Sequence, residues 1–169
     1  MVERSLSATP FHWLGLLAVV FAAVVADQVT KQIVVSMLDL GDSVHLGGPL
    51  EIRHVTNPGI AFGLFSSWAT AVTILTAVAV GWMLFYFARA GARHPVLPVA
   101  LGLLIGGSLA NLIDRLRLGH VTDFIDLRFW PAFNLADTFI VVGVTILLAA
   151  LVAAEREPRL RRTAPKTSG

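Results

Sequence analysis

The chain has 169 residues, of which 56% are hydrophobic and only 14% are charged, and its formal net charge is +2 at pH 7. Soluble globular domains carry about 25% charged residues, so this composition indicates a polytopic membrane protein with one compact bundle. The small net charge argues against nucleic acid as a partner. The absence of cysteine excludes disulfides, thiol nucleophiles and thiolate metal sites.

Four apolar runs are close to the length that crosses a bilayer, which is about 20 residues with a usable range near 17–25. They cover about 12–30, 68–87, 96–113 and 137–154. The first run leads into Asp27 and Lys31 with no convincing small-x-small cleavage site, so we expect it to be a retained helix. The sequence therefore predicts an all-α membrane protein with four transmembrane helices in a single domain, residues 1–155.

Basic residues predict the orientation of these helices. Arg4 precedes the first run, Arg89 and Arg93 lie in the short second connection, and a basic cluster fills the segment after residue 155. Both termini are therefore expected to be cytoplasmic, with 32–67 and 114–137 facing outward. Residues 156–169 are expected to form a disordered basic tail that touches anionic lipid.

The first outer loop contains two segments with strand character. SVHLGG and LEIRHVTN are rich in β-branched and alternating residues, and Gly47-Gly48-Pro49 separates them as a turn signal. The sequence predicts a small extracytoplasmic β-sheet of two or three strands in this loop.

Polar residues gather at the outward ends of the predicted helices. Ionisable groups beside membrane helices are energetically costly and usually functional. The predicted topology brings them into one layer near the outer interface, with Asp123 in the connecting loop. The set comprises Asp27, Lys31, Asn111, Arg115, Asp123, Asn134 and Asp137.

Asp123 and Asp137 form the candidate catalytic pair. Two carboxylates in a partly dry site cannot easily both ionise, so one can activate a water while the protonated partner polarises a carbonyl. That is general acid–base hydrolysis with no metal and no covalent nucleophile. The alternative makes Asp137 a simple N-cap of the fourth helix. The NLAD context and a second aspartate within reach favour the catalytic interpretation.

The other polar residues have open alternatives. Asp27 and Lys31 have i, i+4 spacing and form either a snorkelling surface pair or a structural brace. Arg115 can donate to backbone carbonyls of a substrate or loop, or contact lipid phosphates. Asn57 is either a turn residue or a group that holds a peptide backbone.

The remaining charged and aromatic residues suggest no separate site. Asp114 is expected to be a solvated loop charge or to pair with a basic neighbour. The histidines have no metal-ligand spacing. The other loop carboxylates, also expected to be solvated, are Asp39, Asp42, Glu51 and Asp126, and the aromatic residues of an interfacial belt or lipid-facing opening are Phe62, Phe65, Trp68, Phe124 and Trp130.

Five segments in order resemble one known family. They are DQVTK at 27–31, NPGIAFG at 57–63, GGSLANLIDR at 106–115, GHVTDF at 119–124 and FNLAD at 133–137. Together with the four-helix layout, they resemble the lipoprotein signal peptidases (signal peptidase II) of bacterial inner membranes. The likeness spans nearly all of residues 12–154.

The resemblance implies an aspartic endopeptidase with Asp123 and Asp137 as its catalytic residues and no metal or organic cofactor. The implied substrate is a diacylglyceryl-modified prolipoprotein, cut immediately before the modified cysteine, which enters sideways from membrane lipid. Ala110 departs from the glycine usual at this point of the third motif, and its methyl group could push the third helix away from a neighbour. The implied supporting residues are Asp27, Lys31, Asn57, Gly107, Asn111, Arg115, Asn134 and Ala136.

A non-enzymatic transporter or membrane scaffold is the rival interpretation. It would use Asp27, Asp123 and Asp137 as a proton or cation site. An inverted repeat would support that class, and the sequence contains none that we detect.

Overall fold

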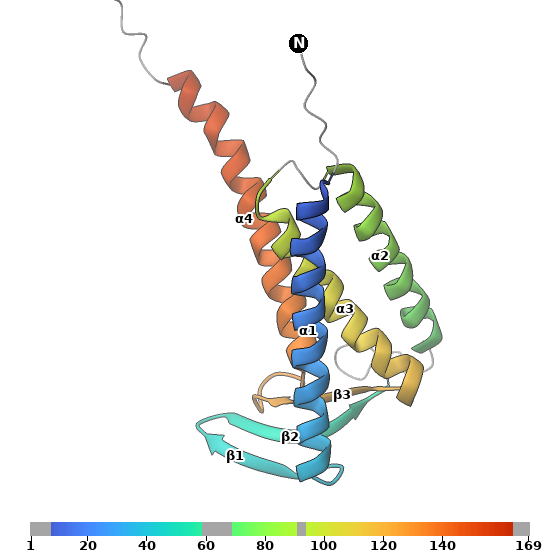
Figure 1. Cartoon of the computed structure of the whole chain (residues 1–169). Coiled ribbons are helices and arrows are strands. Elements are labelled where there is room, and N and C mark those ends of the chain that lie inside the picture. The colour runs from blue at the N-terminus through green and yellow to red at the C-terminus, as the bar shows by residue number, and fades with distance from the viewer. Residues whose placement is uncertain (1–7, 59–68, 91–93, 164–169) are drawn as a thin grey trace, which may run out of the picture.

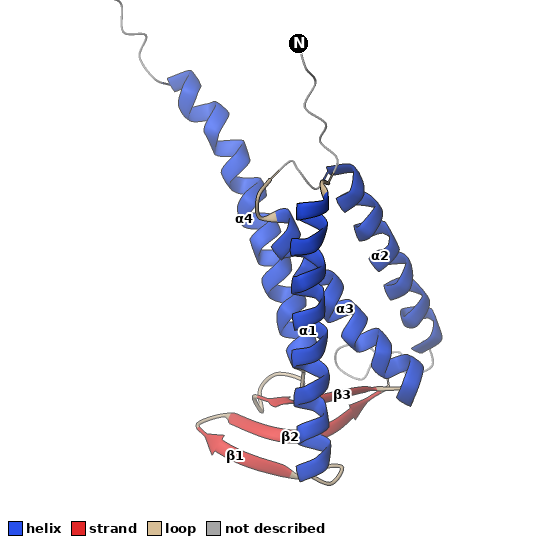
Figure 2. Ribbon diagram, viewed as in Figure 1, coloured by secondary structure: helices blue, strands red, loops and turns tan. Residues whose placement is uncertain are grey.

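The computed structural model describes residues 8–58, 69–90 and 94–163. Within this part of the chain, four helices are long and apolar enough to span a membrane, which confirms the predicted helix count. Figures 1 and 2 show the helices side by side, with a small sheet across one end of the bundle. The helices are α1 (Pro10–Met37), α2 (Ala69–Ala90), α3 (Leu97–Leu118) and α4 (Leu135–Thr163).

Local sequence signals mark several helix ends. α1 begins at Pro10, which suits the first turn because a backbone N–H at that position would have no intrahelical acceptor. α3 ends before Gly119, which adopts φ 77° in the left-handed region and closes the helix. α4 continues through Thr163, so the predicted boundary of a disordered tail at 156 is wrong for 156–163. Four of the eight residues in 156–163 are Arg, which extends a helix readily, and the helix also contains Pro158. Residues 164–169 lie outside the described part of the chain.

α3 is the central helix of the bundle. Two thirds (67%) of its most apolar window is buried, against 17% for α1 and 11% each for α2 and α4. Small residues allow this close packing: a Cβ added at Gly102 would lie 2.8 Å from the Val19 Cβ, and one at Gly106 would lie 2.7 Å from the Ala23 Cβ. Ala110 continues this row one turn further and is fully buried.

The sheet is antiparallel, with the order β1-β2-β3. Strands β1 (Ser43–Gly47) and β2 (Leu50–Asn57) form the predicted hairpin, and Gly47 and Gly48 turn the chain with positive φ. Strand β3 (Val121–Asp126) lies between α3 and α4, so the placement of Asp123 in a loop is wrong. Its first four residues are all buried, so the strand lacks the polar–apolar alternation that would have revealed it.

The sheet lies at one end of the bundle. The start of α1, the end of α2 and the start of α3 lie at the other end (Figure 1). Two predicted solvated carboxylates belong to the sheet instead: Glu51 accepts from Arg128 Nε at 3.0 Å, and Asp126 pairs with Arg53 at 3.6 Å. These pairs link β2 to β3 and to the segment that follows it.

Candidate active site

Asp123 lies on β3 with 2% of its surface exposed. Its two carboxylate oxygens accept hydrogen bonds from two amides, the Asn57 Nδ2 at 2.9 Å and the Asn134 Nδ2 at 2.8 Å. Burial and the negative charge of Asp137 raise the pKa of Asp123, the two amide donors oppose them, and the net pKa is about 6. Asp123 can therefore hold or release a proton close to neutral pH.

Asp137 lies in the first turn of α4 and is only partly buried. The residue that caps this helix is Asn134: its Oδ1 accepts from the Asp137 N–H at 3.0 Å. The Asp137 Oδ2 accepts in return from the Asn134 N–H at 3.2 Å. The alternative in which Asp137 is the N-cap is therefore wrong, because Asn134 is the cap and Asp137 is its reciprocal partner. The Asp137 Oδ1 takes no part in this arrangement and accepts from Asn111.

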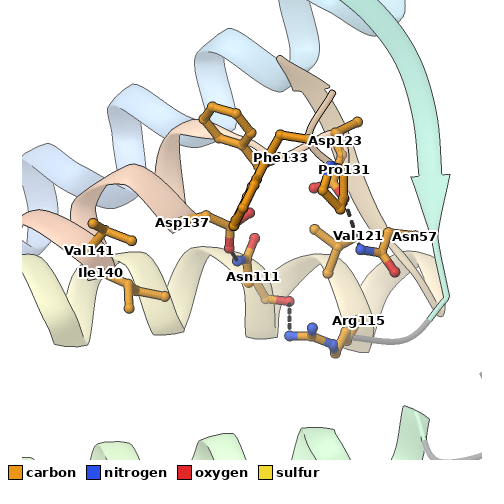
Figure 3. Close-up of a pocket in the computed structure, with 12 residues that line it drawn as sticks. Asn57, Asn111, Arg115, Val121, Asp123, Pro131, Phe133, Asp137, Ile140 and Val141 are labelled. Carbon is orange, nitrogen blue, oxygen red and sulfur yellow. Dashed lines mark hydrogen bonds between the residues drawn. The ribbon is translucent and has the colours of Figure 1, made fainter. Parts of the chain in front are cut away.

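Two amide side chains connect the aspartates. The Asn111 Nδ2 donates to the Asp137 Oδ1 at 2.9 Å, as Figure 3 shows. The Asn134 Nδ2 lies 3.0 Å from the Asn111 Oδ1 and also donates to Asp123. Asparagines from α3 and from the start of α4 thus hold both carboxylates from one side. The predicted convergence of these residues is confirmed in this geometry.

A cavity of about 290 Å³ opens over the two aspartates. Asn57, Asn111 and Arg115 give it a polar side (Figure 3). The Arg115 Nη1 approaches the Asn111 carbonyl oxygen at 3.4 Å. The rest of the lining is mainly apolar: Val121, Trp130, Pro131, Ala132, Phe133, Ile140 and Val141.

Two further cavities adjoin this one on different sides. A cavity of about 150 Å³ lies beside Asp123 and the end of β2, with Val55 and Asn57 in its wall. A larger, apolar cavity of about 370 Å³ lies beside Asp137, between Trp130 and Val142. The aspartates therefore stand between a small cavity beside the sheet and an apolar space against α4.

Asp27 and Lys31 form the predicted i, i+4 ion pair, with Nζ and Oδ2 2.7 Å apart. Both side chains are buried, so the snorkelling alternative is wrong. Asp114 is 4% exposed and lies 2.8 Å from Lys31, so its prediction as a solvated charge is wrong and the alternative of a basic partner is confirmed. Its position three residues after Asn111 on one helical face was the available signal.

Gly107 and Ala136 form a close contact between α3 and α4. A Cβ added at Gly107 would lie 2.4 Å from the Ala136 carbonyl oxygen, so only glycine fits without displacing α4. Ala136 is fully buried directly before Asp137. These two small residues hold the start of α4, and with it Asp137, close to α3.

Some aromatic residues lie elsewhere than predicted, and others lie outside the described residues. Phe124 is 3% exposed and packs inside, so its assignment to an aromatic belt is wrong, whereas Trp130 is exposed and lines the cavity. Residues 59–63 of the second motif, with Phe62, Phe65 and Trp68, lie outside the described residues. Among the described side chains, no group of three or more His, Asp or Glu is placed to hold a metal ion.

Comparison with known proteins identifies close similarities. The family described as signal peptidase (SPase) II matches residues 19–153. The lipoprotein signal peptidase of Moorella thermoacetica is 41% identical over 142 residues, which are 82% of this chain and 89% of that protein. The lipoprotein signal peptidase of Pelotomaculum thermopropionicum is 39% identical over 138 residues, 81% of this chain and 91% of that protein.

Two solved structures share the fold. Each is described as a bacterial membrane enzyme structure obtained by the in meso method. The first, at 2.3 Å resolution, is 27% identical with a TM-score of 0.79, over 99% of this chain and 100% of the other. The second, at 1.9 Å resolution, is 30% identical with a TM-score of 0.75, over 88% and 97%.

Proposed function

The chain belongs to the signal peptidase II family, a family of aspartic peptidases, and we propose that it removes signal peptides from diacylglyceryl-modified prolipoproteins by cutting immediately before the modified cysteine. The observation that carries the proposal is that Asp123 and Asp137, each held by asparagine donors, line one cavity. A small cavity beside the sheet adjoins it at Asp123, and an apolar cavity adjoins it at Asp137. An extended peptide fits the sheet side, and acyl chains fit the apolar side against α4. Membership of a peptidase family removes the reason for the transporter or scaffold alternative.

In the proposed mechanism the two carboxyl groups differ in role. Asp137 lies at the N-terminus of α4 and accepts hydrogen bonds from Asn111 and from the Asn134 N–H, an arrangement of donors that suits a carboxylate. It is the general base that takes a proton from the attacking water. Asp123 is the general acid: burial favours its neutral form, so its proton can be donated to the scissile carbonyl. No metal or organic cofactor takes part in this scheme.

The proposed orientation puts this site at the outer face of the bacterial inner membrane. The start of α1, the end of α2 and the start of α3 lie at the opposite end of the bundle from the sheet (Figure 1), and Arg89 lies in the last turn of α2. Basic residues favour the cytoplasmic side. Both termini are then cytoplasmic, and the substrate reaches the cavity from membrane lipid.

The experiment is cleavage of a diacylglyceryl-modified lipobox peptide by the purified protein in detergent, with Asp123→Asn and Asp137→Asn. General acid–base catalysis contributes about 10²–10⁴-fold to rate, so each variant should lose at least about 100-fold in kcat. Asp126→Asn is the matched control, because it makes the same change on the same strand outside the cavity. An intact peptide after incubation with folded wild-type protein would refute the function, and a fully active Asp123 or Asp137 variant would refute that residue's role.

A further inference from the structure

A buried cluster of charged groups lies next to the two aspartates, and the proposed chemistry does not use it. The Lys31 Nζ is its centre. It lies 2.7 Å from the Asp27 Oδ2, 2.8 Å from the Asp114 Oδ2 and 3.0 Å from the Asn111 Oδ1. An ammonium has three N–H donors, so these three contacts use all of them.

Each carboxylate in this cluster also holds a backbone N–H. The Asp27 Oδ1 accepts from the Ala136 N–H at 2.8 Å, and the Asp114 Oδ2 accepts from the Thr122 N–H at 3.2 Å. Ala136 directly precedes Asp137, and Thr122 directly precedes Asp123. The cluster therefore fixes the main chain immediately before each member of the catalytic pair.

Both N–H groups need an acceptor from outside their own element. The Ala136 N–H belongs to the first turn of α4, where no intrahelical carbonyl is available, and a carboxylate suits a helix N-terminus. Thr122 is 3% exposed, and a buried N–H without an acceptor is destabilising. Asp27 from α1 and Asp114 from α3 supply these acceptors.

The third contact of Lys31 sets the orientation of the Asn111 amide. Because its Oδ1 accepts from the ammonium, its Nδ2 is directed toward the Asp137 Oδ1. A rotated amide would place two donors against each other at Lys31 and two acceptors against each other at Asp137. The charge on Lys31 thus determines which group of Asn111 meets the catalytic carboxylate.

We propose that Lys31, Asp27 and Asp114 form a positioning hub that fixes the separation and orientation of Asp123 and Asp137. The proposal rests on the proposed function and deepens it. The hub residues do not touch the reacting atoms. Their loss misplaces the two carboxyl groups relative to the water and the scissile carbonyl. It therefore lowers kcat, and KM changes little because the cavity walls that bind substrate stay in place.

Two substitutions at Asp114 test this separation of effects. Asp114→Leu removes the acceptor of the Thr122 N–H, and kcat should fall about 100-fold, the effect of a displacement near 1 Å, with KM within about threefold. Asp114→Asn can still present one oxygen to both Lys31 and the Thr122 N–H, so its kcat should stay within about tenfold of wild type. Equal kcat losses in the two folded variants would overturn the hub.

Gln28→Met is the matched control for general loss of stability. The Gln28 Nε2 donates to the Asp114 Oδ1 at 2.8 Å, the oxygen that does not hold Thr122. This variant should melt at a lower temperature than wild type while kcat stays within about threefold. A kcat loss in Gln28→Met as large as that in Asp114→Leu would make the effect one of stability, and the proposal would fail.

Amide hydrogen exchange tests the hub without any cleavage assay. In detergent micelles, Asp114→Leu should speed exchange at the Thr122 N–H by about tenfold or more and leave the Ala136 N–H unchanged. Asp27→Leu should do the reverse. If exchange at the Thr122 N–H were unchanged in Asp114→Leu and exchange at the Ala136 N–H were unchanged in Asp27→Leu, the hub would be refuted even if wild type cleaves. The expected exchange pattern with no cleavage by wild type would refute the proposed function alone.

Discussion

Replacing Asp123 by asparagine should remove activity and, at neutral pH, make the protein more stable. The folded protein raises the pKa of this carboxyl from 3.8 to about 6 because the group is buried. A change of that size corresponds to about 3 kcal/mol between the two protonation states. The charged form of Asp123 is thus held in a site that stabilises its neutral form.

The sign of the pH dependence follows from proton binding. Between about pH 4 and pH 6 the folded protein binds the Asp123 proton more tightly than the unfolded chain does. The free energy of unfolding contributed by this group is therefore highest below pH 4, falls as pH rises through 6, and stays about 3 kcal/mol lower above it. An asparagine side chain does not titrate, so Asp123→Asn lacks this loss.

The net effect also includes hydrogen bonding. Asp123 accepts from both Asn57 and Asn134, and an asparagine has only one acceptor oxygen, which removes about 1 kcal/mol. Asp123→Asn should therefore be about 1 kcal/mol less stable than wild type at pH 4 and about 2 kcal/mol more stable at pH 8. At 2–4 °C per kcal/mol, Tm should be roughly 2–4 °C lower at pH 4 and roughly 4–8 °C higher at pH 8.

The assay is thermal unfolding in detergent micelles, followed by tryptophan fluorescence at pH 4, 6 and 8. Gly81→Ala is the control, since it adds no titratable group and a Cβ there meets nothing within 4 Å. Its difference in Tm from wild type should not vary with pH. If the difference between Asp123→Asn and wild type were also the same at pH 4 and pH 8, Asp123 would not occupy a site that favours its neutral form. The general-acid role would then lose its basis.

Three further outcomes follow from the same geometry. Cleavage measured from pH 5 to 9 should show kcat/KM falling on the alkaline side of about pH 6, as Asp123 loses its proton; a rise there would make Asp123 the base. Gly107→Ala should lower Tm and kcat, because its Cβ would lie 2.4 Å from the Ala136 carbonyl oxygen and would push α3 and α4 apart. Such overpacking lowers the free energy of unfolding by about 1–3 kcal/mol; unchanged melting would contradict that contact. Asn134→Ala should lose about 1 kcal/mol of helix capping in thermal unfolding, together with most of kcat because Asp123 loses a donor; normal kcat would show that the amide bridge is dispensable.

The sequence was sufficient for the features that depend on local composition and spacing. Long apolar runs have no stable place outside a bilayer, so four spanning helices could be predicted and are confirmed. Gly47 and Gly48 between two β-branched segments predicted the hairpin. Polar groups gathered at one end of each of several predicted helices predicted a site there, because lipid excludes them unless they pair with one another.

Strand β3 and the true role of Asp114 depended on the tertiary structure. Val121, Thr122 and Asp123 are all buried because α3, β2 and the start of α4 surround the strand. A strand covered on both faces has no polar–apolar alternation, so its sequence pattern does not reveal it. Asp114 resembles a loop charge until α1 brings Lys31 within 2.8 Å. The sequence left a basic partner open as an alternative, but it did not identify Lys31, which lies far away in the chain.

The difference between the two groups of features is physical. Hydrophobicity and turn geometry belong to a residue and its immediate neighbours, so the sequence by itself determined the helices, the hairpin and the layer in which polar residues meet. Hydrogen-bond partners, burial and the pKa of a carboxyl depend on atoms brought together by packing. Only the tertiary structure decided that Asn134 caps α4, that Asn111 orients toward Asp137, and that Lys31 is buried among acceptors on two helices.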